Sequence, residues 1–213
     1  MKSPVGLERL QPITATHFVE LGLPSQLSGN RDIGVQVHGA VAEGALTYNL
    51  GVFDGVAGGA STDGDLGDGK DVAARLFAHP LRPTNIRWVK EIGLGIAGTY
   101  GERLGTQAST ELSPIRSSGP ATIFQYRSGA SLAETVVADG YSARIVPQAY
   151  AYVGPAGALF EYAWAKQRVS LDDRSNEFET WSWMLAATVV LTGEDATHRG
   201  VEPRHPVGVR GGY

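Results

Sequence analysis

The sequence predicts an all-β chain, and three observations support this prediction. Apolar and polar residues alternate with a period of two along most of the 213 residues, which is the pattern of strands with two different faces. Glycine occurs 28 times, and this residue disfavours helices but suits tight turns and closely packed strands. No run of about 18 apolar residues occurs, so no transmembrane helix is predicted.

The first predicted hairpin lies in the N-terminal half. Residues 33–37 alternate, and residues 46–52 alternate again after the short turn at 42–45. Two strands joined by so short a turn pair as a hairpin. Ahead of them, the stretch between Thr14 and Pro24 has helical spacing, which predicts one short helix that the proline ends.

Five further alternating segments follow: 71–79, 94–100, 141–153, 160–165 and 180–191. The composition Gly-Pro-Ala-Gly predicts a turn at 154–157. Residues 102–140 are interpreted as one long extracellular excursion. A further full strand there would place the turn at 154–157 on the extracellular side, opposite to the short turn at 42–45. Within the excursion, Thr122 to Arg127 is expected to be an extended piece folded against the mouth. Seven sheet strands and this insert are therefore predicted.

The predicted strands have one apolar and one polar face. The polar face carries Gln36, Arg75, Arg144, Gln148, Glu161 and Thr180. A soluble sandwich buries its apolar face, whereas a membrane barrel turns that face to lipid and keeps a polar lumen. Strands of about ten residues, and short turns that contrast with long polar loops such as 54–69, favour an antiparallel up-and-down transmembrane barrel.

Composition excludes several classes of function. The formal net charge of −4 provides no global basic field for nucleic acid. The absence of cysteine excludes thiolate zinc sites and thiol catalysis. No Ser-His-Asp arrangement and no pair of carboxylates set for hydrolysis stands out, so the sequence predicts no enzyme, no cofactor and no metal site.

Three local motifs are interpreted structurally. The GxGxxG match at 93–98 lies inside an alternating segment, so it is interpreted as strand and not as a dinucleotide loop. The polar cluster near the C-terminus lacks metal-ligand spacing and is interpreted as a loop. Its members are Asp195, His198, Glu202 and His205. A solvated acidic loop is predicted for Asp63, Asp65, Asp68 and Asp71.

Seven blocks of the chain carry a family resemblance. In order they are KSPVGLERLQ, NRDIGVQVHG, LTYNLGVFDGV, KDVAARLFAHPL, LGIAGTYGE, ADGYSARIVPQAYAYVGPAGALFEYAWAKQ and VVLTGEDATHRGVEPRHP. Together they cover nearly the whole chain and resemble, in the same order, the phosphate-selective porin O/P family of the bacterial outer membrane. This resemblance implies homotrimers of sixteen-stranded barrels, each with an anion-binding pore, surrounded by lipid and lipopolysaccharide.

About seven or eight of the family's sixteen strands are recognisable here. Residues 1–213 are therefore expected to be a single partial porin domain without the early and the closing strands. Met1 to Leu7 lacks the pattern of a signal peptide, and Val207 to Tyr213 lacks a terminal alternating strand. The chain is accordingly expected to be a fragment or a split reading frame.

A pore for phosphate or other small anions needs fixed cations, and guanidinium presents a planar fork to phosphate oxygens. The candidates are Arg75 and Arg144 on strand faces and Arg116 and Arg127 in the excursion, with Gln36 and Gln148 as further pore-lining residues. An alternative is that these arginines pair with Asp71, Glu161 and similar carboxylates.

Two other functions remain open on the sequence alone. One is a structural outer-membrane β-protein without a specific pore, and the other is a soluble β-sheet binding module. Exposed aromatic residues are expected to form an interfacial girdle, with a sugar-binding platform as the alternative. They are Tyr100, Tyr162, Trp164, Trp181 and Trp183.

Overall fold

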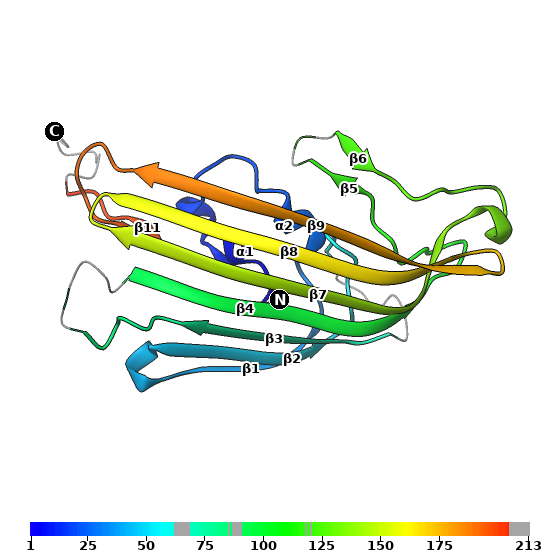
Figure 1. Ribbon diagram of the computed structural model, residues 1–213, viewed down its shortest axis with the longest axis horizontal. Coiled ribbons are helices and arrows are strands. Elements are labelled where there is room, and N and C mark those ends of the chain that lie inside the picture. The colour runs from blue at the N-terminus through cyan, green and yellow to red at the C-terminus, as the bar shows by residue number, and fades with distance from the viewer. Residues whose placement is uncertain (62–68, 85, 87–90, 118, 120, 205–213) are drawn as a thin grey trace, which may run out of the picture.

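The computed structural model describes residues 1–61, 69–84, 86, 91–117, 119 and 121–204. In this part of the chain, seven strands form one antiparallel sheet in the order β1-β2-β3-β4-β7-β8-β9 (Figure 1). Their bounds are β1 (Gly34–Val41), β2 (Leu46–Phe53), β3 (Asp71–Ala78), β4 (Glu91–Leu104), β7 (Val137–Val153), β8 (Ala156–Leu171) and β9 (Arg174–Val189). The all-β prediction and the seven predicted sheet strands are confirmed. The sheet is open, with β1 and β9 at its two edges.

Two short turns lie at one end of the sheet, where β1 meets β2 and β7 meets β8 (Figure 1). The first is the single turn Ala42–Gly44, in which Ala42, Glu43 and Gly44 all have positive φ. The second is shorter than predicted, because Ala156 already begins β8 and only Gly154 and Pro155 remain between the strands. At the opposite end, Asp172 and Asp173 alone join β8 to β9.

The helix predicted between Thr14 and Pro24 is wrong. The N-terminal segment instead holds α1 (Leu7–Leu10), a 3-10 turn at Ile13–Ala15 and α2 (Pro24–Leu27). Pro24 therefore begins a helix, since the first turn needs no N–H donor from its residues. Phe18 and Val19 are exposed, so no apolar stripe is buried that could stabilise a helix there.

The excursion between β4 and β7 spans residues 105–136, because both flanking strands extend further than alternation indicated. Inside it, β5 (Ile115–Arg116) pairs with β6 (Thr122–Phe124) in a separate two-stranded sheet. The prediction that Thr122 to Arg127 contributes no strand to the main sheet is confirmed. Residues 93–98 lie within β4, which confirms that the glycine motif is strand.

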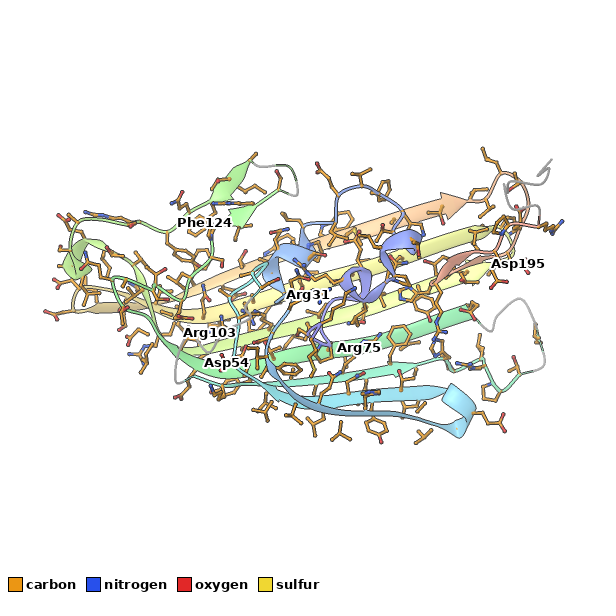
Figure 2. All side chains as sticks on the ribbon, turned by 180° about the vertical axis from the view of Figure 1, so that it is seen from behind. Arg31, Asp54, Arg75, Arg103, Phe124 and Asp195 are labelled. Carbon is orange, nitrogen blue, oxygen red and sulfur yellow. The ribbon has the colours of Figure 1, made fainter. Side chains whose placement is uncertain are left out.

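The N-terminal segment, residues 1–33, covers one face of the sheet, which we call the inner face. Figure 2 shows its short helices in front of the sheet. Two buried clusters join this segment to the strands. Leu7 packs with Phe77 and Leu159, and Val5 packs with Val146 and other small side chains. Strand pairing places the predicted polar set, from Gln36 to Thr180, on this inner face.

The opposite, outer face is apolar and exposed across all seven strands. Its exposed members include Val35, Val37, Leu50, Val52, Val72, Leu76, Leu94, Ile96, Tyr100, Ile145, Phe160, Trp181, Trp183, Leu185 and Val189. Nothing in the described chain packs over this face. Its exposed surface is therefore as apolar as the interior of a soluble protein. No helix in the described ranges is long and apolar enough to cross a membrane.

A small hairpin follows β9 and folds back to the inner face. It consists of β10 (Ala196–Thr197) and β11 (Gly200–Val201). The backbone N–H of Ala196 donates to the carbonyl of Gly154 at 2.8 Å, and the Ala196 side chain is buried in the cluster around Leu7. The hairpin is thereby fixed beside the β7–β8 turn.

Candidate functional site

A groove of about 910 Å³ lies on the inner face at the end of the short turns. Its described walls are the start of the N-terminal segment, strands β1 to β3, the segment after β3, one residue each of β4 and β7, and the β10–β11 hairpin. Its described lining carries the cations Lys2, Arg75, Arg82 and Arg199 against the single carboxylate Glu91. The groove is therefore positively charged although the whole chain is acidic.

Arg75 projects from β3 on the side of the sheet that the N-terminal segment covers (Figure 2). Its Nε donates to Gln148 Oε1 at 3.1 Å, and its guanidinium carbon lies 4.6 Å from the centroid of the Phe77 ring. These contacts fix the guanidinium plane without neutralising its charge. Arg75 forms no ion pair with a described carboxylate, so its charge faces the groove.

Stacked rings support the wall beside Arg75. The Tyr150 ring lies 5.2 Å from Phe77 and 4.7 Å from His198, with the His198 ring nearly parallel to it at 9°. His79 Nε2 lies 2.6 Å from the Tyr150 hydroxyl. The backbone carbonyl of His198 accepts a hydrogen bond from Gln11 Nε2 at 3.2 Å. The hairpin is thus attached both to the sheet and to the N-terminal segment.

The environment of His198 disfavours its charged form. Burial, and to a lesser degree the neighbouring positive groups Arg75, His17, Arg199 and His79, lower the pKa of His198 to about 4. The imidazole is therefore neutral at neutral pH, and its stacking on Tyr150 does not add another cation to the groove.

Arg144 lies elsewhere, in a buried ionic cluster near the other end of the sheet. Asp71 Oδ2 accepts from Arg103 Nη2 at 2.7 Å and from Arg144 Nη1 at 3.4 Å. Both guanidinium groups also donate to the carbonyl of Val56, at 2.9 and 3.0 Å. Arg144 is 5% exposed, so it corresponds to the alternative that the sequence left open, in which an arginine pairs with Asp71.

Two small voids in the described part of the chain are lined by Arg144. One of about 40 Å³ lies between α2, the excursion and β8–β9, and one of about 10 Å³ lies beside Asp32 and Asp71. Phe124 and Tyr126 of the excursion pack on Phe178 of β9, with ring centroids 4.9 and 5.3 Å apart. The inner face is therefore filled at this end and open at the groove.

A buried carboxylate positions the N-terminal segment between these two regions. Glu161 of β8 is fully buried, and its Oε2 accepts the backbone N–H of Glu8 at 2.9 Å. The Glu8 carboxylate accepts from the backbone N–H of Gly22 at 2.7 Å and from Ser25 Oγ at 3.2 Å. Burial raises the pKa of Glu8, and these hydrogen bonds oppose that effect.

The six residues predicted to line a pore do not converge on one site. Arg75 and Gln36 line the groove, and Gln148 lies buried behind Arg75 as its hydrogen-bond partner. Arg144 belongs to the buried ionic cluster. Arg116 and Arg127 are exposed in the excursion and do not line the groove.

Sequence reasoning missed Lys2, Arg82, Arg199 and His198 as groove residues. All four lie outside the alternating strands, so the alternation of residues could not predict on which side of the sheet they lie. His198 was interpreted as part of a polar loop, and only its contact with Tyr150 reveals its place. Of the other motif residues, Asp63, Asp65, Asp68 and His205 lie outside the described residues.

Among the described side chains, no group of three or more His, Asp or Glu residues is placed to hold a metal ion. Comparison of the chain with models of known families, with curated proteins and with solved structures finds no match.

Proposed function

We propose that this chain is part of an outer-membrane β-barrel that passes small anions, such as phosphate, through a cationic lumen. One observation carries the proposal. The sheet exposes a continuous apolar outer face, while its inner face holds polar side chains and a positively charged groove. This polarity is the reverse of that in a soluble sheet and is the arrangement of a membrane barrel.

The outer face supports the membrane part of the proposal. Trp181, Trp183 and Leu185 are 60%, 59% and 63% exposed, and neighbouring strands continue the apolar surface. Soluble monomers rarely expose a contiguous apolar patch of this kind. Exposed tryptophan and tyrosine side chains on the same face fit the interfacial girdle of a membrane barrel.

The groove supports the anion part. Four cations face one carboxylate in its described lining, so the local potential attracts anions. The groove is open to solvent, and water weakens each charge interaction. Binding that is favourable enough for entry and weak enough for release is what conduction requires.

Lipid exposure can be tested by fluorescence quenching. The full chain is refolded into bilayers that contain brominated lipids, using variants that retain Trp181, Trp183 or Trp164 as their single tryptophan. We expect strong quenching of Trp181 and Trp183. Fluorescence that brominated lipid leaves unchanged, together with partitioning into water without detergent, would instead identify a soluble binding module.

Anion passage can be tested on a closed barrel that includes this sheet, by the reversal potential across a bilayer that separates two KCl concentrations. We expect chloride selectivity and a decrease in conductance when phosphate is added. An Arg75→Glu variant should reduce the selectivity, and an Arg168→Glu variant, which changes an exposed arginine outside the groove, should not. Cation selectivity, or conductance that phosphate does not reduce, would contradict the proposal.

A structural outer-membrane protein without a pore is the second candidate. The small voids of about 40 and 10 Å³ around Arg144 favour it, because voids of this size among the described residues are too small for the passage of an anion. This candidate predicts quenching of the outer tryptophans by brominated lipid together with no measurable conductance. The two experiments therefore separate all three functions.

A further inference from the structure

We propose that the groove binds a phosphorylated sugar, with the phosphate between Arg75 and Arg199 and the sugar hydroxyls along a polar row on β1 and β2. This inference rests on the proposed function, since it names the substrate class of the same groove. It goes beyond a general preference for anions because it assigns separate parts of the groove to the charged and the uncharged parts of one ligand.

Arg75 and Arg199 are the two groove cations whose charged groups have the fewest fixed partners. Lys2 Nζ donates to the carbonyl of Arg9 at 2.5 Å, and Arg82 Nη1 donates to that of Gly44 at 3.2 Å. The guanidinium of Arg199 has no hydrogen-bond or ion-pair partner in the described chain, and Arg75 uses only its Nε. Two available guanidinium forks suit the oxygens of a phosphate monoester.

His198 locates these two guanidinium groups relative to each other. All three residues line the same groove, Arg75 from β3, and His198 and Arg199 from adjacent positions in the hairpin. The ring itself is held by stacking on Tyr150 at 4.7 Å. The two cations thus belong to the part of the groove beside this fixed ring, which is where the proposal places the phosphate.

A polar row leads away from Arg75 across the sheet. In the strand register, Arg75 lies opposite Asn49, and Asn49 lies opposite His38. Neighbouring strands are about 4.8 Å apart, so the row from Arg75 to His38 spans roughly 10 Å, which is comparable with the length of a hexose phosphate. Amide and imidazole groups both donate and accept hydrogen bonds, as sugar hydroxyls do.

Gln36 supplies an independent indication that the row binds hydroxyl groups. It lies two residues before His38 on β1, on the same face, and lines the groove. Its Oε1 is buried and has no hydrogen-bond partner. A buried acceptor without a donor is costly, and a sugar hydroxyl entering from the groove would supply that donor.

The size of the groove separates this ligand from simpler ones. A volume of about 910 Å³ lies within the range of sites for drug-sized molecules. A single tetrahedral phosphate would leave the row of Asn49 and His38 without contacts. An uncharged sugar would leave both guanidinium groups without a counter-charge. A sugar phosphate supplies a counter-charge for the two guanidinium groups and hydroxyl groups for Asn49 and His38.

Isothermal titration calorimetry on the full chain, refolded in dodecyl maltoside, tests the inference with glucose 6-phosphate, inorganic phosphate and glucose. We expect glucose 6-phosphate to bind at least about tenfold more tightly than either of the others. Relative to glucose it gains hydrogen bonds to charged guanidinium groups, and relative to inorganic phosphate it gains several neutral hydrogen bonds to the polar row. Arg75→Gln should weaken both phosphate ligands. Asn49→Ala should weaken glucose 6-phosphate alone.

Matched controls are Arg168→Gln and Asn176→Ala, which change exposed residues outside the groove and should leave all affinities unchanged. Asn49→Asp provides a second, nearly isosteric variant and should weaken both phosphate ligands by repulsion. Circular dichroism verifies the fold of each variant. Equal affinities for glucose 6-phosphate and inorganic phosphate, or an Asn49→Ala variant that binds glucose 6-phosphate like the parent chain, would overturn the inference.

Failure of this inference can be distinguished from failure of the proposed function. The titration needs no closed pore, whereas conductance is measured on a closed barrel that includes this sheet. A barrel that binds glucose 6-phosphate selectively but does not conduct keeps the site and overturns transport. A chain that conducts anions but does not distinguish the sugar phosphate from phosphate keeps transport and overturns the site.

Discussion

The backbone N–H of Glu8 donates to the fully buried carboxylate of Glu161, at a sequence separation of 153 residues. This hydrogen bond fixes α1 to the centre of the inner face. It lies between the cluster around Leu7 and the cluster around Val5, so it ties both clusters to one strand.

Replacing Glu161 by leucine should loosen the N-terminal segment. The N–H of Glu8 would lose its acceptor in a buried position, which costs about 1–3 kcal/mol. We expect faster hydrogen exchange across residues 5–10 and a lower free energy of unfolding in detergent. Glu161→Gln, which keeps an oxygen acceptor, serves as the control. Unchanged exchange in the leucine variant would show that apolar packing alone holds the segment.

Replacing Asp71 by asparagine should destabilise the chain strongly. Arg103 and Arg144 would remain buried without their shared carboxylate, and breaking a buried ion pair costs about 3–5 kcal/mol. Urea unfolding in detergent measures the loss, and Asp173→Asn in the exposed β8–β9 turn is the matched control. Equal stability of the two variants would mean that water reaches the cluster and screens its charges.

Acidification should detach the β10–β11 hairpin. Because the pKa of His198 is lowered from 6.5 to about 4 in the folded chain, the unfolded state binds more protons between these values. The stability contribution of neutral His198 is therefore present above about pH 6.5 and is lost as the pH falls toward 4. Hydrogen exchange of residues 196–201, corrected for intrinsic rates, should become faster as the pH falls from about 6.5 toward 4.

A His198→Phe variant is the control for this effect, since it keeps a ring on Tyr150 and removes the titration. Its hairpin exchange should show little dependence on pH across the same range after correction for intrinsic rates. An identical pH dependence in both proteins would assign the effect to another group.

The aromatic contacts of the excursion should hold it against β9. Phe178 packs on Phe124 and Tyr126, and such aromatic pairs contribute about 0.5–1.5 kcal/mol each. Phe178→Ala should therefore increase hydrogen exchange and protease cleavage within residues 105–136. Phe160→Ala on the outer face is the control, and it should leave the excursion protected.

Alternation was sufficient to predict the strands, because a residue period of two follows directly from the pleat of a sheet. It identified all seven sheet strands and placed Gln36, Arg75, Arg144, Gln148, Glu161 and Thr180 on one face. It underestimated the lengths of β1, β4, β7, β8 and β9. Ends such as Arg103 and Lys166 to Leu171 carry polar residues on both faces and lose the pattern.

The candidate site was harder to predict because half of its walls are not strands. Lys2 and Arg199 come from irregular segments whose positions depend on buried contacts elsewhere, such as those of Leu7 and Ala196. Whether a strand arginine faces solvent or a carboxylate also depends on its neighbours across the sheet. Arg75 lies opposite Asn49 and Ala97, whereas Arg144 reaches Asp71 two strands away.

The edges of the open sheet have a consequence for any closed assembly. Neighbouring strands are antiparallel, and the sheet contains an odd number of them, so β1 and β9 run in the same direction. Two copies side by side with the same orientation would thus bring these edges together in parallel. An entirely antiparallel ring that includes this sheet requires an odd number of additional strands. A second copy in the same orientation supplies seven, but both of its junctions are parallel. Copies of this sheet that share one orientation therefore cannot close an entirely antiparallel ring.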